Sequence, residues 1–221
     1  MTGVFKGMKI AVIGGTGDMG YGLALRLAQV GHEIIIGSRQ KERAEAAVEE
    51  ALKLVPNGNF SGQDNHTAAQ QAELAVIAVP SAGHRATVED LKEELKDKAV
   101  LDITIPMAFK PLRYAPPEAG SNALETAEIL GEGCRVAAGF HTISAVLLLD
   151  VEHEMEADTL IVGNDADLKA QVIELAQSIG LKAYDAGTLQ LASTVEGLTP
   201  MLIGMNKRYG SKHIGVQMVG F

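Results

Sequence analysis

A glycine-rich segment near the N-terminus, Gly-Thr-Gly-Asp-Met-Gly at positions 15–20, constrains the fold more than any other part of the sequence. It directly follows an apolar strand predicted at 8–13 and begins a helix, as in a βαβ unit that binds a dinucleotide. Gly15 permits a tight turn, Gly17 lets the backbone approach a pyrophosphate, and Gly20 allows close packing of helix on strand. The helix start offers free N–H groups and a positive dipole end to phosphate. The segment therefore predicts a dinucleotide site rather than a glycine-rich turn without a ligand.

Strand and helix patterns alternate through the first 150 residues. Apolar strands are predicted at 8–13, 33–37, 74–79, 99–103 and 135–140, and helices at 19–30, 40–54, 88–95 and 122–130. This alternation is typical of an α/β fold with a parallel sheet covered by helices, so we expect a Rossmann-type domain over residues 1–150. Residues 106–120 contain four prolines and predict an irregular loop.

The pattern changes in the last seventy residues. A strand at 159–162, a helix at 165–179, a strand at 181–185 and a long apolar helix at 189–205 predict a small α+β domain at 151–221. A unit of this size cannot bury such a helix alone. We therefore expect this C-terminal domain to pack on the Rossmann domain, on a second subunit in a homodimer, or on both.

The composition limits the cellular compartment and the classes of binding partner that are expected for this protein. The formal net charge of -9 argues against nucleic acid and anionic membranes as partners. Cys134 is the single cysteine, which excludes an intrachain disulfide and fits a reducing compartment. No apolar run approaches the roughly 20 residues that span a bilayer, and residues 1–7 have no signal-peptide pattern. We therefore expect a cytoplasmic protein with small-molecule partners.

The residues after the second predicted strand indicate which dinucleotide is bound. NAD-specific Rossmann domains carry an acidic residue there, which accepts hydrogen bonds from the ribose hydroxyls. This strand ends instead in Ser38-Arg39, with Lys41 and Arg43 close behind. A hydroxyl and a guanidinium suit a ribose 2′-phosphate, whereas basic residues at a helix start are otherwise unfavourable against the helix dipole. We therefore expect NADP rather than NAD; the alternative is a solvated basic helix start.

Several runs of the sequence together resemble the NADP reductases that use the deazaflavin coenzyme F420. The runs are 13–20, 22–28 and 31–39, then Ala78-Val79-Pro80 with His84, then Phe-His-Thr-Ile-Ser at 140–144 and Leu-Thr-Pro-Met-Leu at 198–202. The resemblance covers almost the whole chain. It implies a Rossmann domain and a small C-terminal domain with both cofactors in the cleft between them. The reaction implied is reversible hydride transfer between NADP(H) and coenzyme F420.

The resemblance also implies roles for individual residues. Thr16, Gly17, Asp18 and Met19 would join the motif residues Gly15 and Gly20 in the pyrophosphate loop, and Ser38, Arg39 and Arg43 would hold the 2′-phosphate. Val79, Pro80 and His84 would belong to the cofactor site, with Pro80 near the nicotinamide. His141 and Ile143 would lie near the deazaflavin, and Leu198, Thr199 and Pro200 would lie on the C-terminal wall.

Hydride transfer between two planar heterocycles needs little acid–base machinery, because the cofactors carry the reaction and the protein aligns them. Reduction of a deazaflavin also adds a proton, and His141, at the end of a predicted strand, is the candidate catalytic donor. The alternative for His141 is a backbone hydrogen bond, and for His84 a helix cap. No cluster of His, Cys, Asp or Glu has metal-ligand spacing, so no metal is expected.

Other functions are compatible with the same pattern. An NADPH-dependent flavin or ferric reductase could use this module, and a non-catalytic NADP-sensing protein could share its fold. Imine and β-hydroxyacid reductases usually carry a longer helical C-terminal domain. The basic residues Lys207, Arg208 and Lys212 belong either to a solvated terminus or to a clamp for an anionic second substrate.

Overall fold

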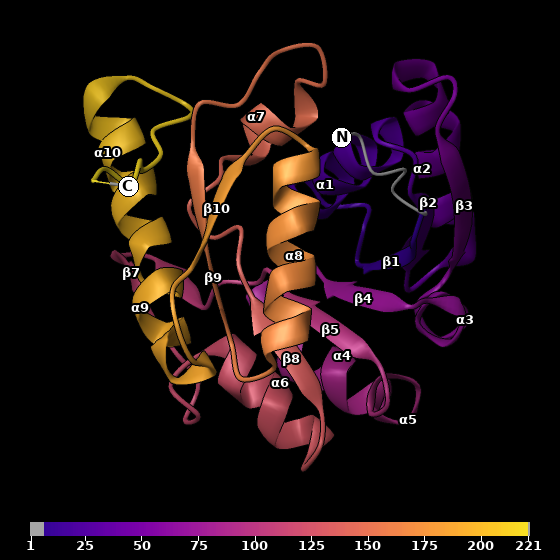
Figure 1. Ribbon diagram of the computed structural model, residues 1–221, viewed down its shortest axis with the longest axis horizontal. Helices are drawn as coiled ribbons and strands as arrows, with labels where there is room; N and C mark the ends of the chain where they lie inside the picture. The colour runs from indigo at the N-terminus through magenta and orange to yellow at the C-terminus, as the bar shows by residue number, and fades with distance from the viewer. Residues whose placement is uncertain (1–6, 221) are drawn as a thin grey trace.

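The computed structural model describes residues 7–220, and one eight-stranded sheet forms its centre (Figure 1). In spatial order the strands are β10 (Lys182–Asp185), β9 (Asp158–Gly163), β8 (Arg135–Ala138), β5 (Ala99–Asp102), β4 (Leu74–Ile77), β1 (Lys9–Ile13), β2 (Glu33–Ser38) and β3 (Asn59–Asp64). Neighbouring strands are parallel except β8 and β9. The expected α/β fold with a Rossmann-type parallel sheet is confirmed, while most of the expected segment at 1–7 lies outside the described residues.

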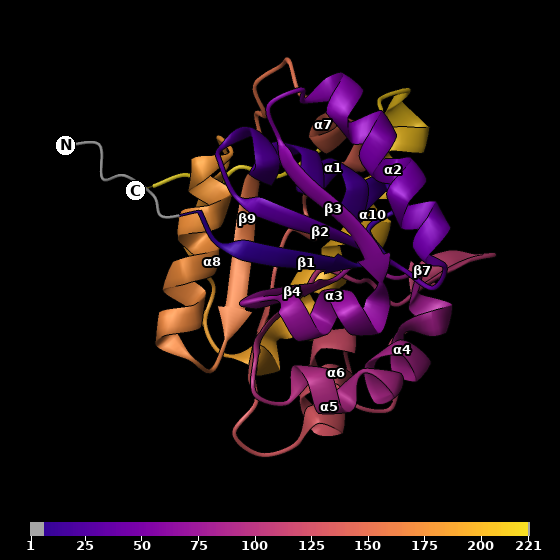
Figure 2. The same cartoon turned by 90° about the vertical axis from the view of Figure 1, so that its right-hand side faces the viewer.

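Helices cover both faces of the sheet because the central strands are apolar on both sides (Figure 2). In β1, Ile10 and Val12 point to one face and Ala11 and Ile13 to the other, and all four are fully buried. One face packs against α1 (Asp18–Gln29), α2 (Lys41–Leu54), α7 (Ala145–Leu149) and α8 (Ala166–Ser178). The other packs against α3 (Asn65–Gln71), α4 (His84–Asp90), α5 (Lys92–Leu95), α6 (Asn122–Leu130) and α9 (Ala192–Glu196). Among the described helices, none is long and apolar enough to cross a membrane.

The C-terminal strands extend the same sheet. β9 pairs antiparallel with β8, and β10 pairs parallel with β9, so the sheet runs without a break past residue 150. The helices α9 and α10 (Leu198–Tyr209) flank the β10 side of the sheet (Figure 1). The division into domains at 1–150 and 151–221 stays a prediction, since it concerns independent folding rather than strand pairing.

The structure corrects several expected elements. The helix expected at 189–205 is broken into a 3-10 turn (Leu189–Leu191), α9 and α10, and the break at Gly197 places Pro200 in the first turn of α10, where a missing N–H is tolerated. β3 and α3 were not expected. The proline-rich segment at 106–120 contains a short hairpin of β6 (Met107–Phe109) and β7 (Leu112–Tyr114).

Candidate functional site

The glycine loop joins β1 to α1, and its three motif glycines face different surroundings. A Cβ on Gly15 would lie 2.7 Å from the carbonyl oxygen of Val12, and one on Gly20 would lie 2.8 Å from the Cβ of Ala78. The space beside Gly15 and Gly20 is therefore occupied by other atoms of the protein. A Cβ on Gly17 would meet only the Gly14 carbonyl oxygen, at 3.7 Å. The open side of the loop is thus at Gly17, which is also the N-cap of α1.

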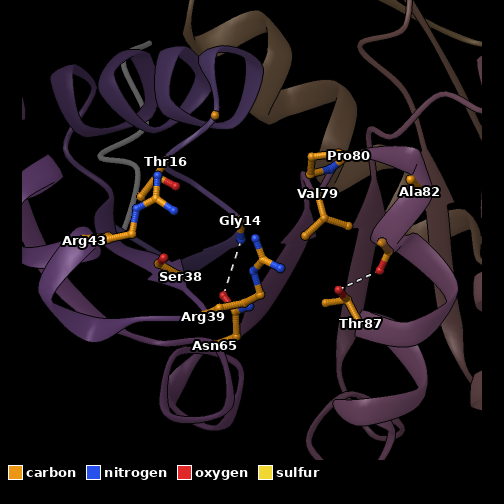
Figure 3. A pocket seen from close by; sticks show the side chains of 12 residues that line it. Gly14, Thr16, Ser38, Arg39, Arg43, Asn65, Val79, Pro80, Ala82 and Thr87 are labelled. Atoms are coloured by element: carbon orange, nitrogen blue, oxygen red, sulfur yellow. Dashed lines mark hydrogen bonds between the residues drawn. The ribbon is translucent and has the colours of Figure 1, made fainter.

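A cavity of about 540 Å³ opens at this loop (Figure 3). It is bounded on one side by the loop and the end of β2, and on the other by the segment after β4. Ser38, Arg39 and Arg43 lie at its β2 end, and no carboxylate is among its lining residues. Those residues are Gly14, Thr16, Gly17, Ser38, Arg39, Arg43, Asn65, Val79, Pro80, Ala82, Gly83 and Thr87.

A second cavity of about 240 Å³ shares Gly17, Val79 and Pro80 with the first. It lies over the carboxyl ends of β4 and β5, where open α/β sheets bind their ligands. Its other lining residues are mostly apolar: Asp18, Met19, Ala78, Ser81, Ile103, Thr104, Ile105 and Met107. The two cavities together form a path from a basic corner, across the glycine loop, to an apolar chamber.

His84 lies behind the turn that separates these cavities, with only 1% of its surface exposed. Its Nε2 is 2.8 Å from Asp102 Oδ2, and its Nδ1 is 2.9 Å from Glu125 Oε2. Burial alone would lower the pKa of His84, but the contacts with the two carboxylates outweigh it and the pKa is raised. Burial alone would raise the pKa of Asp102, but the contact with His84 and the hydroxyl hydrogen bonds outweigh it and hold this pKa below its usual value. The two carboxylates therefore favour the protonated form of the buried His84 side chain.

This network continues into the wall of the apolar chamber. The backbone N–H and the hydroxyl of Thr104 both donate to Asp102 Oδ1, at 2.9 and 2.5 Å. The side-chain amide of Asn122 donates to the Thr104 hydroxyl oxygen at 2.8 Å. Because Thr104 lines the chamber, the polar network fixes that wall from behind. The N-cap of α6 is Ser121, whose side chain accepts from the Leu124 N–H, and Glu125 in the first turn contacts His84.

Glu196 is a second fully buried carboxylate in this region. Its oxygens accept from the backbone N–H groups of Asn122 and Ala123, at 3.1 and 3.2 Å, and from the Tyr114 hydroxyl at 2.9 Å. Burial and the negative charge of Asp102 raise the pKa of Glu196 to about 7, although these hydrogen bonds act in the opposite direction. The carboxylate therefore titrates close to neutral pH.

This raised pKa predicts a pH-dependent contribution to stability. Since the folded protein holds the proton more tightly than the unfolded chain, stability from Glu196 is fully present below the unfolded pKa near 4.5 and is lost as pH rises through about 7. The loss is up to about 1.4 kcal/mol per pH unit within that window. Denaturant unfolding of the wild type and Glu196→Gln from pH 4.5 to 8 should show a stability difference that changes with this slope. Parallel curves would contradict the assignment.

His141 is buried, with 2% of its surface exposed, and neither ring nitrogen has a hydrogen-bond partner among the described residues. Burial lowers the pKa of His141 to about 4, opposed by the charge of Asp102. The residue before it, Phe140, has a φ of 65°, which is strained for a bulky side chain. The Thr199 hydroxyl donates to the His141 carbonyl at 2.6 Å, so the 140–144 segment and the start of α10 are joined.

The predicted site residues therefore fall into two groups. Thr16, Gly17, Ser38, Arg39, Arg43, Val79 and Pro80 line the larger cavity, and Asp18 and Met19 line the chamber. His84, His141 and Ile143 are buried and line neither of these two cavities, and Thr199 contacts the His141 backbone. Asn65 and Thr87, which line the larger cavity, carry no sequence signal that would have singled them out.

The C-terminal tail lies against the 140–144 segment. The Ser144 hydroxyl donates to the Lys212 carbonyl at 2.8 Å, and the Asp158 N–H donates to the Val216 carbonyl at 3.0 Å. The side chains of Lys207, Arg208 and Lys212 are exposed, so their role as an anion clamp stays a prediction. Within the described part of the chain, no three His, Cys, Asp or Glu side chains are arranged to hold a metal ion.

Comparison with known proteins agrees with this geometry. Residues 9–106 match the family described as "NADP oxidoreductase coenzyme F420-dependent". The F420-dependent NADP reductase of Methanocaldococcus jannaschii is 39% identical over 96% of this chain and 98% of its own, and that of Methanothermobacter marburgensis is 40% identical over the same shares. A crystal structure from Arthrobacter sp. FB24, described as a candidate F420-dependent NADP reductase, superposes with a TM-score of 0.83 at 28% identity, covering 97% of this chain and 100% of that one. The chain therefore belongs to the F420-dependent NADP reductase family.

Proposed function

We propose that this chain transfers a hydride, in either direction, between NADP(H) and the deazaflavin coenzyme F420. The observation that carries the proposal is the path along two adjoining cavities, from a basic corner to an apolar chamber, in a chain of this family. A dinucleotide fits the path, since Gly17 leaves open the space that a side chain would fill. Its phosphates would meet the start of α1, and its nicotinamide would reach Val79 and Pro80.

The second substrate would occupy the chamber beyond Pro80. Bound F420 supplies the carbon that exchanges the hydride with the nicotinamide. The residues around it would align the two rings and exclude water, which suits the apolar side chains of Ile103, Ile105 and Met107. Both ring nitrogens of His141 lack partners among the described residues, which is unusual for buried polar atoms, but His141 lines neither cavity, so its contact with the second substrate stays a prediction.

His141 would act here as a neutral imidazole. With its pKa lowered to about 4, it carries no proton to donate as a cation near neutral pH. A neutral ring has one donor and one acceptor nitrogen, so it would orient a ligand by hydrogen bonds, whereas its low pKa makes it a weak base and leaves almost no imidazolium to donate a proton near neutral pH. His84 would act through its network with Asp102, which fixes the turn behind Pro80, rather than by touching the cofactor.

Turnover with a panel of electron acceptors tests the proposed function. NADPH would be mixed with coenzyme F420, FMN or ferric citrate, and its oxidation followed by absorbance. The proposal requires turnover with F420, and His141→Ala should slow that turnover while leaving the NADPH dissociation constant unchanged. Turnover with FMN or ferric iron alone would favour a flavin or ferric reductase, and no turnover at all would favour a sensor.

Arg39 is expected to determine the choice between NADPH and NADH. Arg39→Ala should raise the KM for NADPH by about 10-fold to 100-fold, because one charge-assisted phosphate contact is worth about 1.5–3 kcal/mol, while the KM for NADH barely changes. Steady-state kinetics with both nucleotides check this. Lys41→Ala is the matched control, since Lys41 is basic and begins α2 but pairs with Glu45 and does not line the cavity. Equal changes for both nucleotides in Arg39→Ala would contradict the role.

We further propose that the protein is a homodimer with α10 at or near the interface. Of the residues of α10, only Pro200 and Leu202 are buried, while Met201 is 51% exposed. Light scattering at micromolar concentration should give twice the mass of the chain, and Met201→Glu should shift it towards the monomer. Leu54→Glu, at an equally exposed position on α2, should not. A monomeric wild type would exclude the proposal.

A cytoplasmic location, which fits the single cysteine and NADP(H) chemistry, is also proposed.

A further inference from the structure

The β6–β7 hairpin forms part of the chamber wall, although it lies outside the main sheet. Met107 of β6 lines the chamber, and its cross-strand partner in β7 is Tyr114. Each strand has three residues, and a two-stranded hairpin this short is at best marginally stable alone. Phe109, near the tip, is 68% exposed. The position of Met107 therefore depends on contacts made at the base of the hairpin.

The base of the hairpin is held mainly by hydrogen bonds of the Tyr114 hydroxyl. Its hydroxyl lies 2.9 Å from Glu196 Oε2 and 3.0 Å from the Gly120 carbonyl oxygen. The Ala115 N–H donates to the Pro106 carbonyl at 2.9 Å and closes the hairpin. β7 also lies beside α10, the helix that follows Glu196 (Figure 1). The buried carboxylate of Glu196 is thus the side chain that the Tyr114 hydroxyl contacts in the strand paired with the chamber wall.

Glu196 is itself held rigidly, which makes it a suitable anchor. It satisfies the first two N–H groups of α6, those of Asn122 and Ala123, while Ser121 accepts from the next two. The anchor is therefore joined to Asn122, whose side chain donates to Thr104, which lines the same chamber three residues before Met107. One hydrogen-bonded chain, Tyr114–Glu196–Asn122–Thr104, connects the β6–β7 hairpin to the segment of the chamber wall that precedes it.

We propose that Glu196 and Tyr114 are positioning residues, which hold the β6–β7 hairpin in place and so fix the part of the chamber wall that Met107 forms for the second substrate. This inference rests on the proposed function, because it assumes that the second substrate occupies the chamber. The dinucleotide cavity does not include Met107, Tyr114 or Glu196 among its lining residues. Loss of the Tyr114–Glu196 hydrogen bond therefore weakens binding of the second substrate and leaves NADPH binding unchanged.

The test combines amide hydrogen exchange with kinetics on the full-length protein. Tyr114→Phe removes the hydroxyl and keeps the ring, so exchange in residues 107–114 should accelerate about fivefold to tenfold, as expected for the loss of one ordinary hydrogen bond. The KM for F420 should rise by a similar factor, with the NADPH dissociation constant unchanged within about twofold. Glu196→Gln should have at least as large an effect. The double variant should change exchange and the KM little beyond the single variants, because both substitutions alter the same Tyr114–Glu196 hydrogen bond.

Matched controls are Tyr209→Phe and Glu174→Gln, which make the same chemical substitutions at exposed positions elsewhere in the chain. Unchanged exchange in residues 107–114 of Tyr114→Phe would overturn the proposal, and so would faster exchange with an unchanged KM for F420. If Glu196→Gln does not fold, Tyr114→Phe decides alone. If the wild type does not reduce F420 at all, the proposed function fails, and the exchange rates still show whether the hairpin is fastened through Tyr114.

Discussion

Replacing Gly17 by valine is expected to weaken NADPH binding by at least about 100-fold, which corresponds to roughly 2.7 kcal/mol, while the protein stays folded. The reason is the geometry of the loop. A Cβ at this position has open space before it, with the nearest atom at 3.7 Å, and the backbone there is extended, with a φ of −86°. The fold therefore accepts a side chain, but that side chain would occupy the space where the pyrophosphate must approach the backbone.

Titration calorimetry with NADPH measures this loss, and thermal unfolding checks the fold. Gly17→Ala should fall between the wild type and the valine variant, because its side chain fills less of the same space. Gly20→Val is the contrasting variant, since its Cβ would lie 2.8 Å from that of Ala78 and should destabilise the fold itself. NADPH binding of normal strength by Gly17→Val would show that the dinucleotide does not cross this loop.

The sequence predicts the central strands and the glycine loop because their signals are local. β1, β4 and β5 are short apolar runs, and the spacing of Gly15, Gly17 and Gly20 has meaning only between a strand and a helix. β3 lacks such a signal. It is an edge strand whose six residues include one large apolar side chain, Phe60, and its pairing with β2 is what makes it a strand.

The buried polar network could not be predicted, because its members come from distant parts of the chain. His84 is 18 residues from Asp102 and 41 from Glu125, and Glu196 is 74 residues from Asn122. Each of these side chains taken alone is typical of a solvated surface. Only the packing of α4, α6 and α9 on one face of the sheet brings them together. The position of the site follows from the sequence, whereas the support behind its walls follows from the fold.

Arg26 of α1 connects the helix of the phosphate loop to the region around His141. Sequence patterns do not reveal this role either. Its guanidinium donates to the carbonyl oxygens of Leu147, Leu148, Asp150 and His153, at and beyond the end of α7. The last carbonyls of a helix lack partners within it, and a basic group there is favourable. α7 has five residues, too few to be stable without such a cap. It follows directly on the 140–144 segment, so Arg26 joins the phosphate-loop helix to the region around His141.

Arg26→Ala is expected to lower the free energy of unfolding by about 3–5 kcal/mol. A hydrogen bond from a charged group contributes about 1.5–3 kcal/mol, the four are not additive, and their loss leaves carbonyl oxygens without partners. Arg26 is 7% exposed, so water cannot replace it readily. Gln29→Ala is the matched control on the same helix, since it removes one exposed bond to the Val151 carbonyl and should cost less than about 1 kcal/mol. Denaturant unfolding of both variants at one pH makes the comparison, and equal losses would show that Arg26 does not hold α7 in place.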